Sequence, residues 1–350
     1  MPNKETQILD EVMVKSRRKM LTLGGTALAG LIFAGAKSAA AASYTDADIL
    51  NFALNLEYLE ANYYYLSAFG CTIDAPNSAA IAAGAPPAGI PITGSVGTQG
   101  MVTGGSKVPF TTIQVSSYAN ETALEEGKHV LFLQAALGSS AVAQPAIDLG
   151  ASWQTLATAA KIPGGASFTP YANDQTFLVG AYVFEDVGVT AYHGAASLLT
   201  KSADLSAAAG ILSVEAYHAG LVRTAIYALD PTSTSIGSYT DLISALRAQL
   251  SLAASPVTLS GAAANPYDTN PDDFGVSNFT TPSGLGSGSA ATAARITDAD
   301  PVNAIAFARN PTQVLNIVTG GGAVKSGAVV SPAVGVFFPN GLNAGPNGFK

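Results

Sequence analysis

Two short segments of the sequence each carry a glutamate and a histidine three residues apart. Glu126 and His129 lie in EEGKHVLFLQ, and Glu215 and His218 lie in ILSVEAYHAG. Residues at this spacing share one face of an α-helix, so each segment would present a carboxylate and an imidazole together. The second segment is otherwise apolar, and buried groups of this kind must be paired, neutralised or bound to a metal.

Two further glutamates extend the pattern. Glu57 lies in ILNFALNLEYLEANYYYL and Glu185 lies in FLVGAYVFEDVGVTAYHG, and each is followed seven residues later by a tyrosine, Tyr64 and Tyr192. The order along the chain is therefore Glu, Glu-x-x-His, Glu, Glu-x-x-His. This order is typical of helical bundles in which side chains from four helices converge on two metal ions.

The distribution of glutamate makes the pattern specific. Charged residues are only 11% of the 350 residues, against a usual share of about 25%. Beyond residue 42 there are seven glutamates: Glu57, Glu60, Glu121, Glu125, Glu126, Glu185 and Glu215. Six of them lie in the four segments just named, and Glu121 lies four residues before one of these segments. A single Glu-x-x-His would be weak, whereas the ordered repeat is a strong motif.

The pattern predicts a dinuclear metal site. Buried carboxylates cannot all remain ionised without compensation, and two divalent cations would offset four of them. Oxygen ligands with one imidazole for each ion suit two Fe or Mn ions. The six predicted ligands are Glu57, Glu126, His129, Glu185, Glu215 and His218.

The repeat also suggests how the ligands divide. We expect Glu126 and Glu215 to bridge the two ions. Glu57 with His129 would then complete one ion, and Glu185 with His218 the other. Coordination positions would remain open for water, dioxygen or peroxide.

Several neighbouring residues have alternative roles. Glu60 lies one turn from Glu57 and is the predicted catalytic base, although it could instead be a ligand, a residue that supports a ligand, or a solvated residue. Glu121 and Glu125 are expected to be exposed. His193 lies off the Glu185 face, so we expect it at the surface or behind the ligands.

Other polar residues near the predicted ligands also have alternative roles. Tyr64 and Tyr192 could donate hydrogen bonds to the ligands or relay electrons, but tyrosines at this spacing are more often packed in a core. Asp186 and Arg223 could form an ion pair behind the ligands.

Apolar periodicity, capping residues and glycines delimit the helices. We predict four bundle helices and an amphipathic fifth helix, at about 48–69, 113–137, 175–200, 203–229 and 238–252. Asp174 and Ser202 are the predicted N-caps of the third and fourth helices. A short helix is expected near Trp153 to Lys161.

The connecting segments are rich in glycine and proline. Residues 71–110 are predicted to be a long loop with a hairpin around Ile92 to Val102. The segment PVNAIAFARNPTQVLNIVTG predicts two short helices broken by Pro311. We divide the chain into a leader (1–42), the bundle with the fifth helix (43–252) and an irregular C-terminal extension packed on the bundle (253–350).

The N-terminus has the layout of a secretory signal peptide. Arg17 and Arg18 precede the apolar run LTLGGTALAGLIFAGA, and small residues follow. The paired arginines indicate the twin-arginine route, which predicts a periplasmic or secreted protein. A membrane anchor is the alternative, but the run is short and glycine-rich for a span. We therefore expect no stable membrane span after processing.

Charge patterning excludes one class of partner. The net charge is −8, and nothing resembles the clustered lysines and arginines of a nucleic-acid-binding surface. The expected partner is a small oxidant, peroxide or dioxygen. The alternative role of the C-terminal extension is a contact between copies of the chain in a homo-oligomer.

The sequence resembles the ferritin-like superfamily, and within it the exported family that includes plant and bacterial desiccation-related proteins. NLEYLEANYYYLSA resembles the first ligand helix of ferritins, while EEGKHVLFLQAALG, NAIAFARNPTQVLNIVTG and FFPNGLN resemble the exported family. The resemblance covers about 45–350. It implies an all-α fold: a ferritin-like four-helix bundle with a long loop between its first two helices and a largely irregular C-terminal coat. Manganese catalases resemble the chain in ligand pattern too.

Three functions are compatible with this pattern. The first is an oxidoreductase, catalase-like or peroxidase-like, that handles peroxide or dioxygen in stress protection. The second is a non-catalytic desiccation- or stress-protective structural protein stabilised by the metal site. The third is iron binding or storage, which is the weakest because ferritin cages are built from short bundles without a heavy coat.

The export route can be tested directly. Changing both Arg17 and Arg18 to Lys should trap the precursor in the cytoplasm, because the twin-arginine pathway requires the arginine pair. Immunoblotting of cytoplasmic and exported fractions would measure this. Normal processing of the double variant would contradict the twin-arginine assignment.

Overall fold

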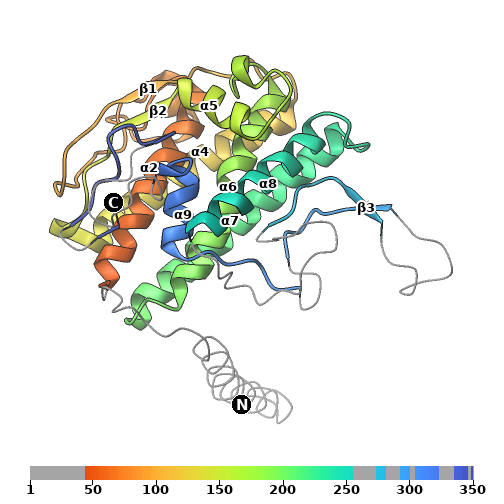
Figure 1. Cartoon of the computed structure of the whole chain (residues 1–350). Coiled ribbons are helices and arrows are strands. Elements are labelled where there is room, and N and C mark those ends of the chain that lie inside the picture. The colour runs from red at the N-terminus through yellow and green to blue at the C-terminus, as the bar shows by residue number, and fades with distance from the viewer. Residues whose placement is uncertain are drawn as a thin grey trace, which may run out of the picture. The chain divides into compact units, whose positions relative to one another are not determined.

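Four long helices form the bundle. They are α2 (Asp46–Phe69), α4 (Ile113–Leu137), α6 (Asp174–Ala196) and α7 (Ser202–Leu229). The computed structural model describes residues 44–254, 273–280, 292–299, 304–322, 335–345 and 348–349. Helix α2 packs mainly against α4, and α6 against α7, while further contacts join α2 to α6 and α4 to α7 (Figure 1). The predicted all-α four-helix bundle is confirmed.

Helix α2 is buried along almost its whole length. Thr45 begins it with a capping box, in which Thr45 and Asp48 satisfy each other's backbone N–H groups. Gly70 ends it at φ +76°, a left-handed conformation that favours glycine. Of its 24 residues, 20 are buried, so α2 is covered on every side rather than along one stripe.

Two of the predicted caps are wrong. Asn173, and not Asp174, caps α6 through a capping box with Thr176. Asp174 instead accepts hydrogen bonds from the backbone N–H groups of Thr111 and Thr112, where α4 begins. Lys201 occupies the N-cap position of α7 without a side-chain hydrogen bond, and Ser202 is the first helical residue. At α6 the sequence offers two adjacent capping residues, and the contact of Asp174 with the start of α4 distinguishes them.

The predicted hairpin around Ile92 to Val102 is also wrong. Strand β1 (Val102–Gly104) pairs in parallel with β2 (Ile147–Leu149), and Val96 bridges to Val142. The strand partners therefore come from beyond α4, and no local turn pattern could reveal them. The same loop contains the short helix α3 (Ser78–Ala83), and α5 (Ala151–Ala159) follows β2. Single 3₁₀ turns lie at Gly138–Ser140 and Gly165–Ser167.

The C-terminal third adds the helix at Pro311–Val318 in its described parts. Helix α8 (Ile236–Ala254) precedes it, and α9 (Pro311–Val318) packs against α8 and α6. Residues 304–310 are not helical, and Pro311 is the first residue of α9 rather than a break between two helices. Strands β3 (Asn278–Thr280) and β4 (Thr292–Ala294) pair antiparallel. The predicted leader lies outside the described residues, and the predicted domain limits stay predictions.

Hydrogen bonds tie the described C-terminal segments to the bundle. The side-chain oxygen of Asn55 on α2 accepts from the backbone N–H of Asn343 at 3.1 Å, and its amide nitrogen donates to the Asn343 carbonyl at 2.8 Å. The backbone N–H of Arg309 donates to the Thr190 carbonyl on α6 at 2.9 Å. These bonds satisfy buried polar groups that would otherwise be unpaired.

A buried ionic cluster reinforces this attachment. Asp273 lies 2.7 Å from Nε of Arg247 and 2.6 Å from Nη2 of Arg309. Asp186 of α6 lies 2.9 Å from Arg223 and 3.3 Å from Arg247, so the suspected Asp186–Arg223 pair is present. Burial alone would raise the pKa of Asp273, but Arg247 and Arg309 outweigh burial and lower it. The cluster links α6, α7 and α8 to the C-terminal segments.

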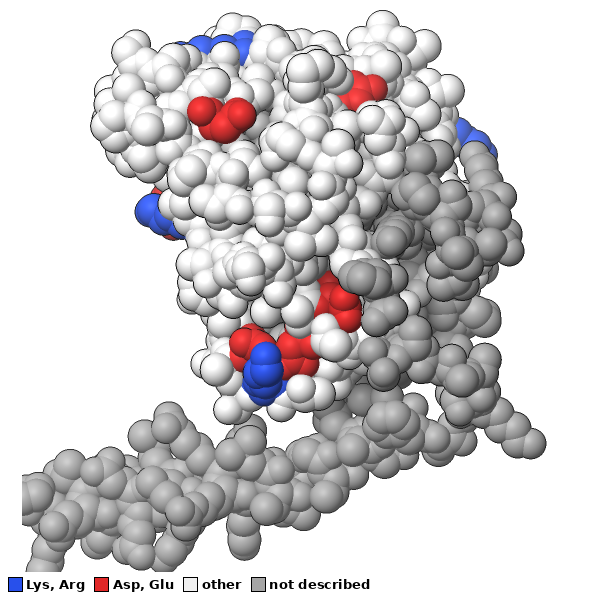
Figure 2. Space-filling model, turned by 90° about the vertical axis from the view of Figure 1, so that its left-hand side faces the viewer, with Lys and Arg blue, Asp and Glu red and all other residues white. Residues whose placement is uncertain are grey.

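One face of the molecule carries little charge. Figure 2 shows a face on which acidic and basic side chains are few and scattered, without a basic cluster. Among the described helices, α7 is long and apolar enough to cross a membrane by length and composition alone. It packs against α6 and points Glu215, His218 and Arg223 inward, as a core helix does.

The ionic cluster generates a stability prediction. Asp273→Ala should lower the free energy of unfolding by about 3–5 kcal/mol, because it removes the buried carboxylate that lies against the guanidinium groups of Arg247 and Arg309. Asp204→Ala is the control: it removes an ion pair with Lys201, whose side chain is 72% exposed, and should cost about 0–1 kcal/mol. Urea unfolding followed by circular dichroism would measure both. Equal losses in the two variants would contradict a stabilising role for the cluster.

Candidate metal centre

All four bundle helices contribute to one polar cluster in the core. Helix α2 supplies one glutamate, α6 supplies another, and α4 and α7 each supply a glutamate and a histidine. Every one of these side chains is buried, with His129 the most exposed at 8%. They are the six ligands predicted from the sequence: Glu57, Glu126, His129, Glu185, Glu215 and His218.

Four of these residues form the first group. Atoms of Glu57, Glu126, His129 and Glu215 that could bind a metal lie within 4.8 Å of one another. His129 Nδ1 is 3.3 Å from Glu57 Oε2, 3.4 Å from Glu126 Oε2 and 3.4 Å from Glu215 Oε1. One imidazole nitrogen therefore faces three carboxylate oxygens from three different helices.

The second group shares a residue with the first. Glu126, Glu185 and His218 also have candidate ligand atoms within 4.8 Å of one another. His218 Nδ1 is 3.0 Å from Glu126 Oε1 and 3.5 Å from Glu185 Oε2. Glu126 thus directs one oxygen toward each histidine, as a bridging carboxylate would. Glu215 belongs to the first group only, so bridging by Glu215 stays a prediction.

The chemistry of these atoms fits a metal centre. Each of the six side chains has at least one buried nitrogen or oxygen that forms no hydrogen bond, although these atoms lie close together. Buried polar atoms without partners are rare and costly. Ligand atoms bound at right angles around an octahedral divalent ion lie about 3 Å apart, which is close to the 3.0–3.5 Å separations in the cluster.

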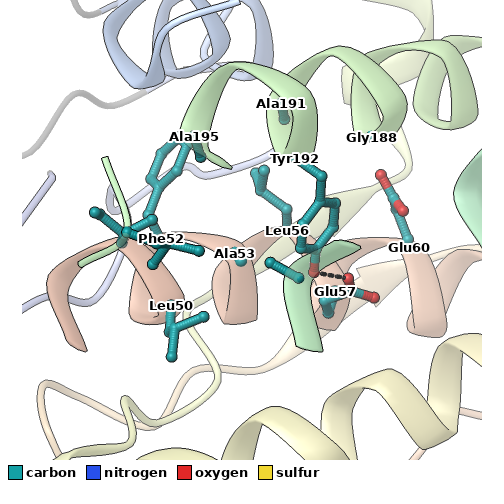
Figure 3. A pocket seen from close by; sticks show the side chains of 13 residues that line it. Leu50, Phe52, Ala53, Leu56, Glu57, Glu60, Gly188, Ala191, Tyr192 and Ala195 are labelled. Carbon is teal, nitrogen blue, oxygen red and sulfur yellow. Dashed lines mark hydrogen bonds between the residues drawn. The ribbon is translucent and has the colours of Figure 1, made fainter. Parts of the chain in front are cut away.

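Two tyrosines brace the cluster in a crossed arrangement. The Tyr64 hydroxyl of α2 donates to Glu185 Oε1 of α6. The Tyr192 hydroxyl of α6 donates to Glu57 Oε1 of α2, and Figure 3 shows this second hydrogen bond. We call Glu57 and Glu185 the outer glutamates. Each tyrosine lies seven residues after one outer glutamate in the sequence and donates its hydrogen bond to the other one. The hydrogen-bonding alternative for both tyrosines is therefore present, and it leaves the Oε2 atom of each glutamate directed into the cluster.

A glycine provides the room that one carboxylate occupies. A Cβ atom on Gly188 of α6 would lie 2.4 Å from Glu215 Oε2, which is well inside van der Waals contact. Glycine is unfavourable in a helix interior by roughly 0.5–1 kcal/mol relative to alanine. The sequence therefore accepts a weaker helix at this point, and Glu215 lies closer to α6 than any side chain at 188 would permit.

One contributing residue was missed by the sequence analysis. Glu125 was expected to be exposed, but it is half-buried and lies 2.7 Å from His218 Nε2. A carboxylate on the outer nitrogen of a metal-binding histidine fixes the orientation of the ring. Glu125 follows no spacing rule relative to His218, since the contact crosses from α4 to α7. Only the order of acidic residues, Glu125 directly before Glu126, could have drawn attention to it.

The remaining candidates lie outside both groups. Glu60 is buried on α2, and its side chain extends toward α6 beside the cluster (Figure 3). Glu121 is exposed, as expected. His193 is half-buried, and its Nδ1 lies 3.0 Å from the carbonyl oxygen of Phe307.

Burial raises the pKa of most of the carboxyl groups. Burial raises the pKa of Glu57 to about 7, with His129 partly opposing it. Burial also raises the pKa of Glu185, again against an opposing histidine. The pKa values of Glu60 and Glu215 are raised well above normal by burial and then by repulsion from neighbouring carboxylates.

Glu126 differs because both histidines face it. Burial acts to raise its pKa, but His129 and His218 outweigh burial and hold the pKa below the usual range. In turn, burial acts to lower the pKa of each histidine, and the surrounding carboxylates raise it well above normal. Without a metal, protonated histidines on either side of an ionised Glu126 therefore supply the positive charge.

Comparisons with known proteins agree with this architecture. The model of the ferritin-like domain family matches residues 45–228, just over half of the chain. A desiccation-related protein, PCC13-62, from Craterostigma plantagineum is 29% identical over 215 residues, which are 59% of this chain and 62% of that protein. The match thus spans less than two thirds of that relative's length. No solved structure matches the chain. The chain belongs to the ferritin-like domain family, as its ligand pattern and fold predicted.

Proposed function

We propose that the chain binds two Fe or Mn ions at this cluster and acts on a small oxidant, peroxide or dioxygen, in stress protection outside the cytoplasm. The observation that carries the proposal is the set of buried ligand atoms from four helices that lack hydrogen-bond partners and face one another. Two divalent cations would supply the charge and the bonds that these atoms lack.

The ligands divide naturally between two ions. Glu57 and His129 would hold one ion, Glu185 and His218 would hold the other, and Glu126 would bridge them. Glu215 would complete the first ion and could extend to the second. Glu125 would orient His218 from behind.

The ions would supply the redox chemistry, and the chain's own residues would manage protons and geometry. Tyr64 and Tyr192 hold the outer glutamates in place through their hydroxyl groups. Glu60 is a buried carboxyl group that belongs to neither ligand group and lies one helical turn from Glu57 on α2. Because burial raises its pKa, Glu60 would carry a proton that it could deliver to or take from a bound oxidant.

A non-catalytic role is the second candidate. The name of the plant relative connects it to desiccation, and a metal that joins four helices would stabilise the bundle whether or not it turns over a substrate. Iron storage remains the weakest candidate, since the C-terminal segments cover the bundle. Export by the twin-arginine route would fit a metal loaded in the cytoplasm before transport.

Metal content is the first test of the proposal. Purified protein should carry close to two Fe or Mn ions for each chain, and Glu126→Ala should lose most of both because Glu126 faces both histidines. Gly188→Ala should also lower the content, since it displaces Glu215. The matched control is Gly210→Ala on α7, where a new Cβ would meet nothing within 4 Å. Inductively coupled plasma mass spectrometry would measure the content, and an unchanged content in Glu126→Ala would contradict the ligand assignment.

A measurement of oxidant consumption then distinguishes an enzyme from a protein in which the metal has only a structural role. Protein loaded with Fe or with Mn should consume peroxide or dioxygen faster than the free ions do. Glu60→Gln should slow consumption without emptying the site, because it removes a proton carrier and leaves every ligand. An oxygen electrode and peroxide absorbance would measure the rates. Fully loaded protein without turnover would favour the structural role.

The metal-free protein should have an unusual dependence on pH. Burial raises the pKa of Glu57 from 4.5 to about 7, so the folded state binds protons that the unfolded chain has released. Its stability should therefore fall as pH rises from about 4.5 to about 7. The raised pKa values of both histidines extend this loss above pH 6.5, while the lowered pKa of Glu126 reduces stability below pH 4.5.

The metal-loaded protein should behave in the opposite way. Protons compete with the metal for the same side chains, so acidification from about pH 7 to about 4.5 should destabilise it. Thermal unfolding of both forms across this range is the measurement. Parallel pH trends for the two forms would contradict a buried cluster that binds metal.

A further inference from the structure

An apolar pocket runs along α2 to the metal cluster. It lies between α2, α6 and the beginning of α7, and we call it pocket A (Figure 3). Phe52, Ala53 and Leu56 form its α2 wall, and Ala191 and Ala195 form its α6 wall. Its free volume is about 30 Å³, which is room for one or two molecules of water size.

The inner end of pocket A meets the cluster. Among its lining residues, only Glu57, Glu60 and Tyr192 have polar side chains. The Tyr192 hydroxyl is already engaged with Glu57 Oε1, and the other Glu57 oxygen faces His129. A small molecule that moves through pocket A would therefore contact apolar side chains along most of the pocket before it reached the carboxylates.

A second apolar pocket meets the first at Glu60. This pocket, pocket B, lies between α2, α6, α8 and α9, and Leu246, Leu250 and Val187 are among its lining residues. Leu56 and Glu60 line both pockets. The Glu60 side chain thus lines both apolar spaces, one helical turn from the ligand Glu57.

The lining distinguishes between the two candidate oxidants. Hydrogen peroxide donates and accepts hydrogen bonds, and moving such a molecule into an apolar space without partners costs several kcal/mol. Dioxygen is a small apolar molecule and loses no hydrogen bonds there. Apolar protein cavities of this type also bind xenon, which serves as a probe for small gases.

We infer that pocket A binds small apolar gas molecules and is the route by which dioxygen, rather than peroxide, reaches the cluster past Leu56 and Glu60. This inference rests on the proposed function, since it names which of the two oxidants the site receives. Pocket B is a second apolar space, and Leu56 and Glu60 line it as well.

The first test needs no activity. Crystals of the metal-loaded protein under xenon pressure should show xenon in pocket A. Ala53→Leu and Ala195→Leu should remove it, because the larger side chain fills the space. The matched control is Ala196→Leu, which lies on the same helix, is equally half-exposed and does not line the pocket. Absence of xenon from pocket A in the unmodified protein would overturn the inference.

The second test uses the two oxidants. In Ala53→Leu and Ala195→Leu, kcat/KM for dioxygen should fall roughly tenfold, which corresponds to a barrier about 1.4 kcal/mol higher. The rate with peroxide and the metal content should stay at the level of the Ala196→Leu control. Thermal unfolding would confirm that the variants are folded. Equal slowing with both oxidants, or no slowing with dioxygen, would overturn the route.

The two tests separate failure of the route from failure of the proposed function. Metal-loaded protein that binds xenon in pocket A but consumes neither oxidant would refute both the proposed function and the route. Protein that consumes dioxygen at an unchanged rate when pocket A is filled would refute the route alone.

Discussion

Four carboxylates lie in contact inside an apolar bundle, and the rest of the structure depends on compensating them. Glu57, Glu126, Glu185 and Glu215 are all at or below 1% exposure. They are shielded from bulk water, so their charge must be offset by protons, by the two histidines or by metal ions. This requirement explains why the histidines of α4 and α7 each lie three residues after a glutamate. It also explains why the remaining polar atoms of the cluster face one another without hydrogen bonds.

Such a cluster persists only if the surrounding helices fix its geometry. Tyr64 and Tyr192 cross between α2 and α6, so each outer glutamate is held from the opposite helix. Gly188 allows Glu215 to approach α6. On an adjacent face of α6, Asp186 joins the arginines of α7 and α8 and so connects the bundle to the C-terminal segments. The same helix therefore supplies a ligand on one face and an anchor for the outer segments on another.

The parts of this arrangement that follow local rules could be predicted from the sequence. Glu-x-x-His spacing placed the ligands on helix faces, and glycine and threonine marked the ends of α2. Contacts between distant segments could not be predicted in this way. The pairing of β1 with β2, the hydrogen bonds from Thr111 and Thr112 to Asp174, and the contact of Glu125 with His218 all join residues more than 40 positions apart. For Asp174 and Glu125, the sequence showed a polar residue at a helix end or surface, and only the fold revealed its partner.

The position of Glu60 links the cluster to the apolar spaces around it. A structural metal site would gain nothing from a buried carboxyl group outside the ligand groups, since burial of such a group is costly. Glu60 nevertheless lies at 6% exposure between two apolar pockets and beside the ligands. A proton carrier at the point where a small molecule would arrive is a feature expected of a reactive site. The cost of burying Glu60 is therefore the strongest structural argument for turnover over a purely stabilising metal.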